Sequence, residues 1–146
     1  MALVVAEIGE GTLVKLEARG HVWNADEPPE ARGTDQGPNP YELLLSSLGA
    51  CTLLTLRMYA HHKKLTLRSV RAEYEHTREY ARDCRECEED DGAKLDVIRA
   101  KVTIRGEFDE ATRERLTQIV SRCPVHRTLE GGPKMFEEVE FEAPPS

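Results

Sequence analysis

A long apolar segment at residues 39–62 constrains the fold more than any other feature of this chain. Asn39 and Pro40 supply a capping side chain and a first-turn proline, which predict that a helix begins there. The leucines that follow are spread over most of the helix circumference, a pattern typical of a helix surrounded by protein. Arg57 inside the segment disfavours a membrane span, because arginine is costly at the centre of a bilayer. We therefore predict a buried helix in a soluble protein.

The length of this helix also predicts how the protein assembles. At about 1.5 Å per residue, a helix over residues 39–62 is roughly 30 Å long, which is close to the width of a small domain. One subunit of 146 residues can hardly cover such a helix on every side. We therefore predict a homodimer that buries the helices of both subunits.

Composition excludes several classes of protein. The net charge of -7 and the absence of a basic stripe disfavour a nucleic-acid partner. A 39% hydrophobic content over 146 residues predicts a single domain spanning residues 1–146. The N-terminus has no basic region followed by a long apolar run, so we expect a cytoplasmic protein. In that compartment the four cysteines are expected to be reduced, catalytic or metal-binding rather than joined in structural disulfides.

The rest of the chain predicts short strands and one further helix. Strand patterns cover residues 2–8, 13–18, 21–24, 67–80, 95–108 and 135–141. Residues 109–122 predict an amphipathic helix, while residues 26–40, 81–94 and 125–130 predict a proline-rich loop, an exposed hairpin tip and a connecting segment. This order lacks a βαβ alternation, so it predicts an α+β fold whose antiparallel sheets pack on the central helix.

Cys51 lies in the middle of the apolar segment among small residues. Gly49, Ala50 and Thr52 stand beside it, and small neighbours allow a backbone or a substrate to approach closely. A lone cysteine in such a helix can also be an ordinary small core residue. Because burial disfavours a charged thiolate, a reactive Cys51 requires a neighbouring cation. Arg32, on the loop before the helix, is the first candidate; the others are Arg19, Arg57 and Arg122.

The remaining cysteines allow several interpretations. We expect Cys123 at the C-terminal end of the second helix, where carbonyl groups disfavour a thiolate, so it suits a second thiol that attacks an oxidised partner. Cys84 and Cys87 form a CxxC that could be half of a zinc site, completed by His76, or a redox pair, or part of a solvated acidic hairpin. His126 could pair with Cys123 or serve in capping.

Two motifs carry a resemblance to a known family. GPNPYELLLSSLGACT, at residues 37–52, and RCPVHRTL, at residues 122–129, resemble the OsmC/Ohr family of osmotically inducible protein C and the organic hydroperoxide resistance proteins. The resemblance covers most of the chain. It implies the family's α+β fold, in which antiparallel sheets wrap around a central buried cysteine-bearing helix in an intertwined homodimer.

The resemblance also implies an activity and its residues. In the family, the helix cysteine attacks a hydroperoxide and the cysteine of the C-P-V motif resolves it; the matching residues are Cys51 and Cys123. The activating arginine of the family matches Arg32, or Arg19 by comparison with the Ohr branch. Glu42 matches the family's glutamate with a displacement of one residue. A thiol peroxidase for oxidative stress defence follows, reduced by an external dithiol and without a metal or haem cofactor.

The expected substrate is an organic hydroperoxide, because an alkyl tail suits the apolar surroundings of the helix. Two other functions stay open. The chain could bind an apolar ligand without turnover, or it could bind a metal through Cys84 and Cys87.

Overall fold

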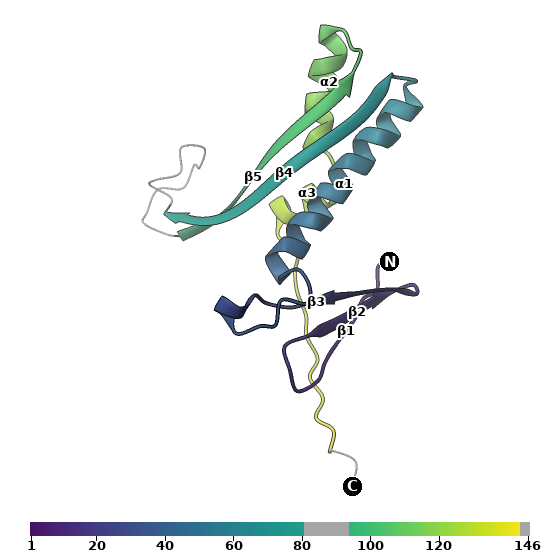
Figure 1. The fold of residues 1–146 in the computed structure, drawn as a ribbon. Coiled ribbons are helices and arrows are strands. Elements are labelled where there is room, and N and C mark those ends of the chain that lie inside the picture. Colours follow the sequence, from purple (N-terminus) through teal and green to yellow (C-terminus); the bar gives the residue numbers. More distant parts are fainter. Residues whose placement is uncertain (81–93, 144–146) are drawn as a thin grey trace.

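The computed structural model describes residues 1–80 and 94–143. The expected hairpin tip, with Cys84 and Cys87, therefore lies outside the described residues. In chain order the elements are β1 (Val5–Ile8), β2 (Val14–Ala18), β3 (His21–Ala25), the 3₁₀ turn η1 (Pro29–Ala31), α1 (Pro40–His62), β4 (Leu67–Tyr80), β5 (Lys94–Gly106), α2 (Glu110–Val120) and α3 (Pro124–Gly131). Both sheets are antiparallel, which confirms the predicted α+β class (Figure 1).

The three N-terminal strands form a meander in the order β1-β2-β3. Strands β2 and β3 pair from Val14 opposite Ala25 to Ala18 opposite His21. Their two-residue turn places Arg19 at φ 51° and Gly20 at φ 85°. Left-handed conformations at both positions match the twist of the flanking strands, as hairpins of this length require. Arg19 therefore belongs to the tip of a tight hairpin.

Helix α1 begins where the sequence predicts. The side chain of Asn39 accepts a hydrogen bond of 2.8 Å from the backbone N–H of Glu42, and Pro40 occupies the first turn. At the other end of the helix, Arg57 donates to the carbonyl oxygens of Leu67 and Arg68. By length and mean hydropathy, 1.4, α1 is apolar enough to cross a membrane. The two hydrogen bonds of Arg57 join this apolar helix to the start of β4.

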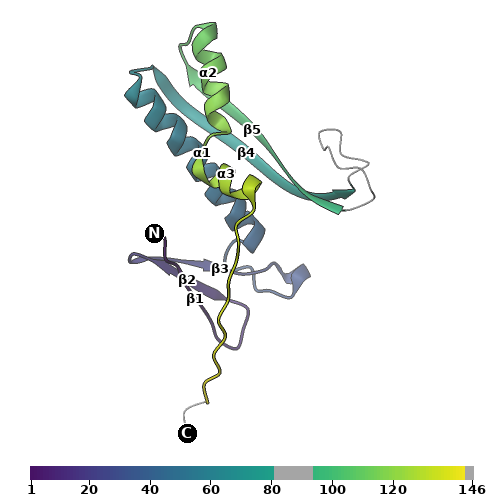
Figure 2. The same cartoon turned by 180° about the vertical axis from the view of Figure 1, so that it is seen from behind.

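The protein core lies between the long hairpin and the helices. Strands β4 and β5 pair from Leu67 opposite Gly106 to Tyr80 opposite Lys94, and α1 and α2 pack on the same side of this ribbon (Figure 1). Seen from behind, α3 lies beside α1 below the end of α2 (Figure 2). The buried centre of the cluster consists of Leu56, Leu116 and Ile119; partly buried side chains from β4 and β5 pack against it.

One face of α1 is bare in a single protomer, as the sequence predicts for an apolar helix too long for one subunit to cover on every side. The buried residues, Leu48, Thr52, Leu56 and Ala60, recur every four positions and form one stripe. On another face, the exposed fractions of Leu54 and Met58 are 56% and 66%. The cause is the position of the β1–β3 sheet, which lies beyond the N-terminal end of α1 instead of on its side (Figure 1).

Residues 125–130 lie in a helix, so the prediction of a connecting segment there is wrong. Helix α2 ends at Val120, and α3 then begins at Pro124 with Cys123 as its N-cap. Proline at the first helical position is favourable, because it has no N–H to leave unsatisfied and its φ is already helical. The Cys-Pro pair therefore starts a helix of its own, beyond the end of α2.

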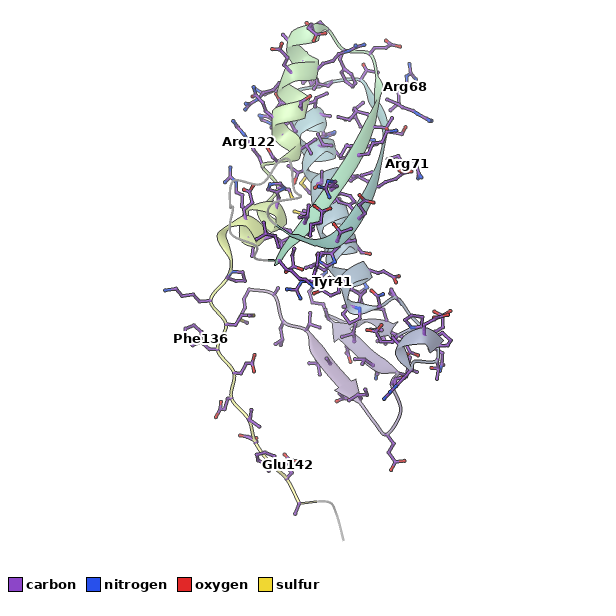
Figure 3. All side chains as sticks on the ribbon, turned by 90° about the vertical axis from the view of Figure 1, so that its left-hand side faces the viewer. Tyr41, Arg68, Arg71, Arg122, Phe136 and Glu142 are labelled. Atoms are coloured by element: carbon purple, nitrogen blue, oxygen red, sulfur yellow. The ribbon has the colours of Figure 1, made fainter. Side chains whose placement is uncertain are left out.

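The predicted last strand at residues 135–141 is also wrong for a single protomer. This segment is extended but pairs with no strand among the described residues. It runs away from the helices, and the exposed fractions of Phe136 and Phe141 reach 90% and 97% (Figure 2, Figure 3). A strand needs a neighbouring backbone for its hydrogen bonds, and one protomer supplies none here.

Candidate functional site

Cys51 lies in the middle of α1, at the border between its buried stripe and its bare face. Its neighbour Thr52 is buried, its other neighbour Ala50 is exposed, and Cys51 itself is half-buried. Cys51 is a free thiol. A sulfur at this border can meet a molecule that approaches α1 from its uncovered side.

Cys123 is the N-cap of α3 and is fully buried, with an exposed fraction of 0%. Its sulfur accepts a hydrogen bond of 3.3 Å from the backbone N–H of His126. The predicted position at the C-terminal end of a helix is therefore wrong, because α2 has already ended at Val120. The groups that face this sulfur are the N–H groups of a new helix and not the carbonyl groups of an old one.

The two cysteine motifs meet through Thr52. The hydroxyl oxygen of Thr52 lies 3.5 Å from the sulfur of Cys123, although 71 positions separate these residues in the chain. Because Thr52 directly follows Cys51, the sulfur of Cys123 packs against the turn of α1 that carries Cys51. The structure thus places the fully buried thiol of Cys123, at the start of α3, against the turn of α1 that carries the half-buried thiol of Cys51.

A cavity of about 320 Å³ lies between α1, β4, β5 and the two C-terminal helices, and Thr52 is one of the residues that line it. Its apolar lining consists of Leu48, Ile98, Ala100, Val120 and Leu129, and its polar lining of Thr52, Tyr74, Asp96, His126 and Glu130. The hydroxyl of Tyr74 is buried without a hydrogen-bond partner in the described part of the chain. The cavity is thus a mostly apolar space with one unsatisfied hydroxyl beside it.

His126 takes part in capping α3 and does not pair with Cys123 through its imidazole ring. Its backbone N–H donates to Cys123, while its ring nitrogen Nε2 lies 3.1 Å from a carboxylate oxygen of Glu130. The side chain thus turns along α3, away from the sulfur. Its role is to complete the first turn of α3 and to line the adjoining cavity.

The candidate cations lie apart from Cys51 within one protomer. Arg32 ends η1 with a left-handed φ of 67°, is exposed, and has no side-chain partner among the described residues. Arg19 lies at the β2–β3 turn, Arg57 binds the carbonyl groups at the start of β4, and Arg122 projects outward beyond α2 (Figure 3). No described contact joins any of these guanidinium groups to Cys51.

Glu42 lies in the first turn of α1. It precedes Cys51 by nine residues, which corresponds to roughly 13 Å along the helix axis and to the opposite face of the helix. The carboxylate of Glu42 and the sulfur of Cys51 therefore do not meet in one protomer. Glu42 instead lines a shallow groove between α1 and β4.

Asp26 is a buried polar residue that the sequence analysis missed. Only 2% of it is exposed, and it accepts hydrogen bonds from the side chains of Thr12 and Thr34 and from three backbone N–H groups. The hydrogen bond from Thr34 lowers the pKa of Asp26 well below its ordinary value of 3.8; burial opposes this, while Thr12 and the backbone N–H groups add to it. The only signal in the sequence is an aspartate that ends a strand before a loop containing two glycines.

His76 has partners other than a metal. Its Nε2 lies 2.9 Å from a carboxylate oxygen of Asp96, and its ring stacks on Tyr41 with 4.2 Å between the ring centroids. These contacts join the start of α1 to the long hairpin. Within residues 1–80 and 94–143 no three metal-ligating side chains gather, and the zinc interpretation of Cys84 and Cys87 stays a prediction.

Comparison with known proteins agrees with this arrangement. The family model described as OsmC-like protein matches residues 33–138. An OsmC-like protein from Mycoplasma pneumoniae is similar in structure, with a TM-score of 0.69, 22% identity, and 90% of this chain and 89% of that chain covered. An organic hydroperoxide resistance protein OsmC from Legionella pneumophila gives a TM-score of 0.63 at 19% identity, with 90% of each chain covered. No curated protein matches the sequence.

Proposed function

This chain belongs to the OsmC-like protein family, and from that premise we propose that it is a thiol-dependent peroxidase that reduces organic hydroperoxides to alcohols. One observation carries the proposal: the sulfur of Cys123 lies 3.5 Å from the hydroxyl of Thr52, the residue next to Cys51. A similar fold in a protein named for organic hydroperoxide resistance supports it. The cellular role is defence against oxidative stress in the cytoplasm, where an external dithiol is at hand.

Cys51 performs the first step, because it is the more exposed of the two thiols. Its thiolate attacks the O–O bond of the hydroperoxide. A sulfur–oxygen bond forms as the O–O bond breaks, the alkoxide takes a proton, and the alcohol leaves. Cys51 remains as a sulfenic acid. The apolar walls beside α1 favour a substrate with an alkyl or aryl group over hydrogen peroxide.

Cys123 performs the second step from its buried position. Its sulfur attacks the sulfenic sulfur of Cys51, a disulfide forms, and the hydroxyl leaves as water with the proton of the thiol. The two Cα atoms must lie within about 7 Å for this bond. A dithiol then reduces the disulfide by exchange and supplies the two electrons of the cycle. The cycle uses no metal or haem.

A homodimer completes the site. In one protomer Arg32 and Glu42 lie away from Cys51, and α1 has a bare face with Leu54 and Met58 exposed. A second copy covers that face. Arg32 of the partner subunit then stabilises the Cys51 thiolate, and the carboxylate of Glu42 holds the guanidinium group of that arginine in place. Arg19 is the alternative cation.

The first test measures intact mass after treatment with cumene hydroperoxide. It uses a Cys84→Ser/Cys87→Ser background, so that the CxxC cannot form a disulfide of its own. We expect this protein to lose about 2 Da as Cys51 and Cys123 join, and its Cys123→Ser variant to gain about 16 Da as a sulfenic acid. Cys51→Ser should abolish both changes and all turnover with dithiothreitol. Unchanged masses in all variants would remove the peroxidase proposal.

The cavity beside Thr52 favours a second candidate function. A mostly apolar pocket of about 320 Å³, beside a Tyr74 hydroxyl that has no hydrogen-bond partner among the described residues, can hold a small neutral ligand without chemistry. In that case Cys51→Ser would leave ligand affinity unchanged, whereas Leu129→Trp, which fills the cavity, would abolish it. Turnover that depends on Cys51 favours the peroxidase.

A further inference from the structure

The loop at residues 26–38 is closed on itself by backbone hydrogen bonds. The N–H of Asp26 donates to the carbonyl oxygen of Pro38 at 3.1 Å, which joins the two ends of the loop. Inside the loop, the N–H of Asp35 donates to Glu27 and that of Gly33 to Pro28. Loops whose ends meet and whose interior is filled by their own groups are compact units.

The carboxylate of Asp26 is the centre of this loop. One oxygen accepts from the hydroxyl of Thr12 and from the N–H groups of Glu27 and Thr34, and the other accepts from the hydroxyl of Thr34 and the N–H of Gln36. A buried carboxylate is stable only when donors surround it in this way. These bonds hold the chain on both sides of Arg32, at residues 27 and 34.

Two glycines show how closely the backbone packs around Asp26. A Cβ at Gly33 would overlap the carbonyl group of Glu27, and a Cβ at Gly37 would lie 2.7 Å from the carbonyl oxygen of Asn24. Arg32 itself adopts a left-handed φ of 67°, which residues with a Cβ rarely occupy. The backbone at Arg32 is therefore held by its surroundings in a conformation that it would not adopt freely.

The side chain of Arg32 is exposed to solvent, whereas its backbone is held in place. The residue is exposed, and its guanidinium has no hydrogen-bond or ion-pair partner in the part of the chain that the structure describes. The loop thus has a fixed backbone and carries at its tip a positive charge without an ion-pair partner among the described residues. A charge held in this way can meet an anion outside its own protomer without first ordering a flexible segment.

We propose that Asp26 is a positioning residue of the peroxidase: its carboxylate keeps residues 26–38 closed, so that Arg32 is presented at a fixed place to the Cys51 thiolate. Asp26 acts only through the loop and does not touch the reacting atoms. The inference rests on the proposed function, because it assigns to Arg32 the role of the activating cation. It adds the group that sets where this cation stands.

The first experiment tests the loop without any peroxidase chemistry. Trypsin cleaves after arginine, so the cleavage rate of the Arg32–Gly33 bond in the full-length protein reports how often the loop opens. We expect Asp26→Asn and Thr34→Val to raise this rate at least about tenfold. Thr117→Val, which removes a hydroxyl from the exposed face of α2, should leave it unchanged. If Asp26→Asn does not fold, Thr34→Val decides. Unchanged cleavage in Thr34→Val would overturn the proposal.

The second experiment is a double-mutant cycle on the rate of Cys51 oxidation in a single turnover. Asp26→Asn and Arg32→Ala should each slow the reaction at least roughly tenfold, and the double variant should be no slower than Arg32→Ala alone. In both single variants the rate should recover at higher pH, where the thiolate forms without help. A purely structural role for Asp26 predicts additive losses and an unmoved pH profile, and that result would overturn the proposal.

The controls separate failure of this inference from failure of the proposed function. If Arg32→Ala leaves the rate unchanged while Cys51→Ser abolishes it, the peroxidase stands and the positioning role of Asp26 is overturned. If Cys51→Ser retains full activity, both proposals are overturned. The tryptic result is independent of both outcomes, because it reports only whether Asp26 holds the loop closed.

Discussion

Leu56 and Leu116 in the helical half of the protomer are fully buried, whereas Ile8 and Val22 in the N-terminal sheet are more than half exposed. The same contrast separates the long hairpin, which packs against α1, from the C-terminal segment, whose Phe141 contacts almost nothing. One half therefore has a core of its own, and the other half exposes apolar side chains that a soluble protein normally covers. In the proposed homodimer, a second copy covers these exposed side chains.

The two halves also divide the chemistry between them. Cys51 and Cys123 lie in the half with the core, where packing fixes their relation through Thr52. The cation candidates Arg19 and Arg32 lie in the exposed half, on a hairpin turn and on the closed loop. The position of the thiols is thus a property of one chain, whereas in the proposed mechanism the position of the cation depends on how the second copy covers the exposed half.

The largest expected effect compares two leucines of α1. Leu56→Ala removes a fully buried side chain and should lower the free energy of unfolding by about 2–5 kcal/mol, as measured by urea denaturation. Leu54→Ala, two residues away on the bare face, should cost less, and its effect should vary with protein concentration because it acts at the proposed interface. Equal, concentration-independent losses for the two variants would contradict the division of α1 into a buried stripe and a bare face.

A smaller effect is expected from the C-terminal segment. Replacing Phe136 and Phe141 with alanine should raise the dissociation constant of the homodimer at least about tenfold, because burying one such ring contributes about 1.5–3 kcal/mol. Sedimentation equilibrium measures this constant. The matched control replaces Glu137 and Glu142 with alanine in the same segment and should leave assembly nearly unchanged. If the wild-type protein sediments as a monomer at every concentration, the proposal that a homodimer buries Phe136 and Phe141 is wrong.

The fold was largely predictable because local patterns determine most of its elements. Period-two alternation predicted both long strands, and Asn39-Pro40 predicted the start of α1. The errors have a common cause: they lie where the outcome depends on contacts outside the segment. Residues 135–141 have a strand pattern but no neighbouring backbone in one protomer. Residues 125–130, which were predicted to be a connecting segment, belong to a helix that packs on α1.

The candidate site was predictable only in its residue types. The sequence indicated that Cys51 and Cys123 belong together, through the resemblance, but not that Thr52 is the group that joins them. Its interpretation of Cys123 failed because a Cys-Pro pair can either end a helix or begin one, and the choice depends on how residues 124–131 pack on α1. Asp26 was missed because its hydrogen-bond donors come from residues 12 to 36, and no local pattern reveals such a gathering.

The smallest expected effect is a change in how stability depends on pH. It concerns Asp26, which is buried as deeply as the core although it lies in the exposed half. Since hydrogen bonds hold its pKa well below 3.8, its ionised form contributes stability that is complete above about pH 4 and is lost as the pH falls further. Asp26→Asn should therefore flatten the acid limb of the stability curve between about pH 4 and pH 2, measured by thermal unfolding. Glu79 and Asp109, whose pKa values are lowered by hydrogen bonds from Arg99 and Thr112, titrate in both proteins, so the difference between the curves isolates Asp26. The control is Glu30→Gln, because Glu30 lies on the same loop but is exposed. If Glu30→Gln changes the acid limb as much as Asp26→Asn does, the charge of the loop, and not the buried hydrogen bonds, sets the stability at acid pH.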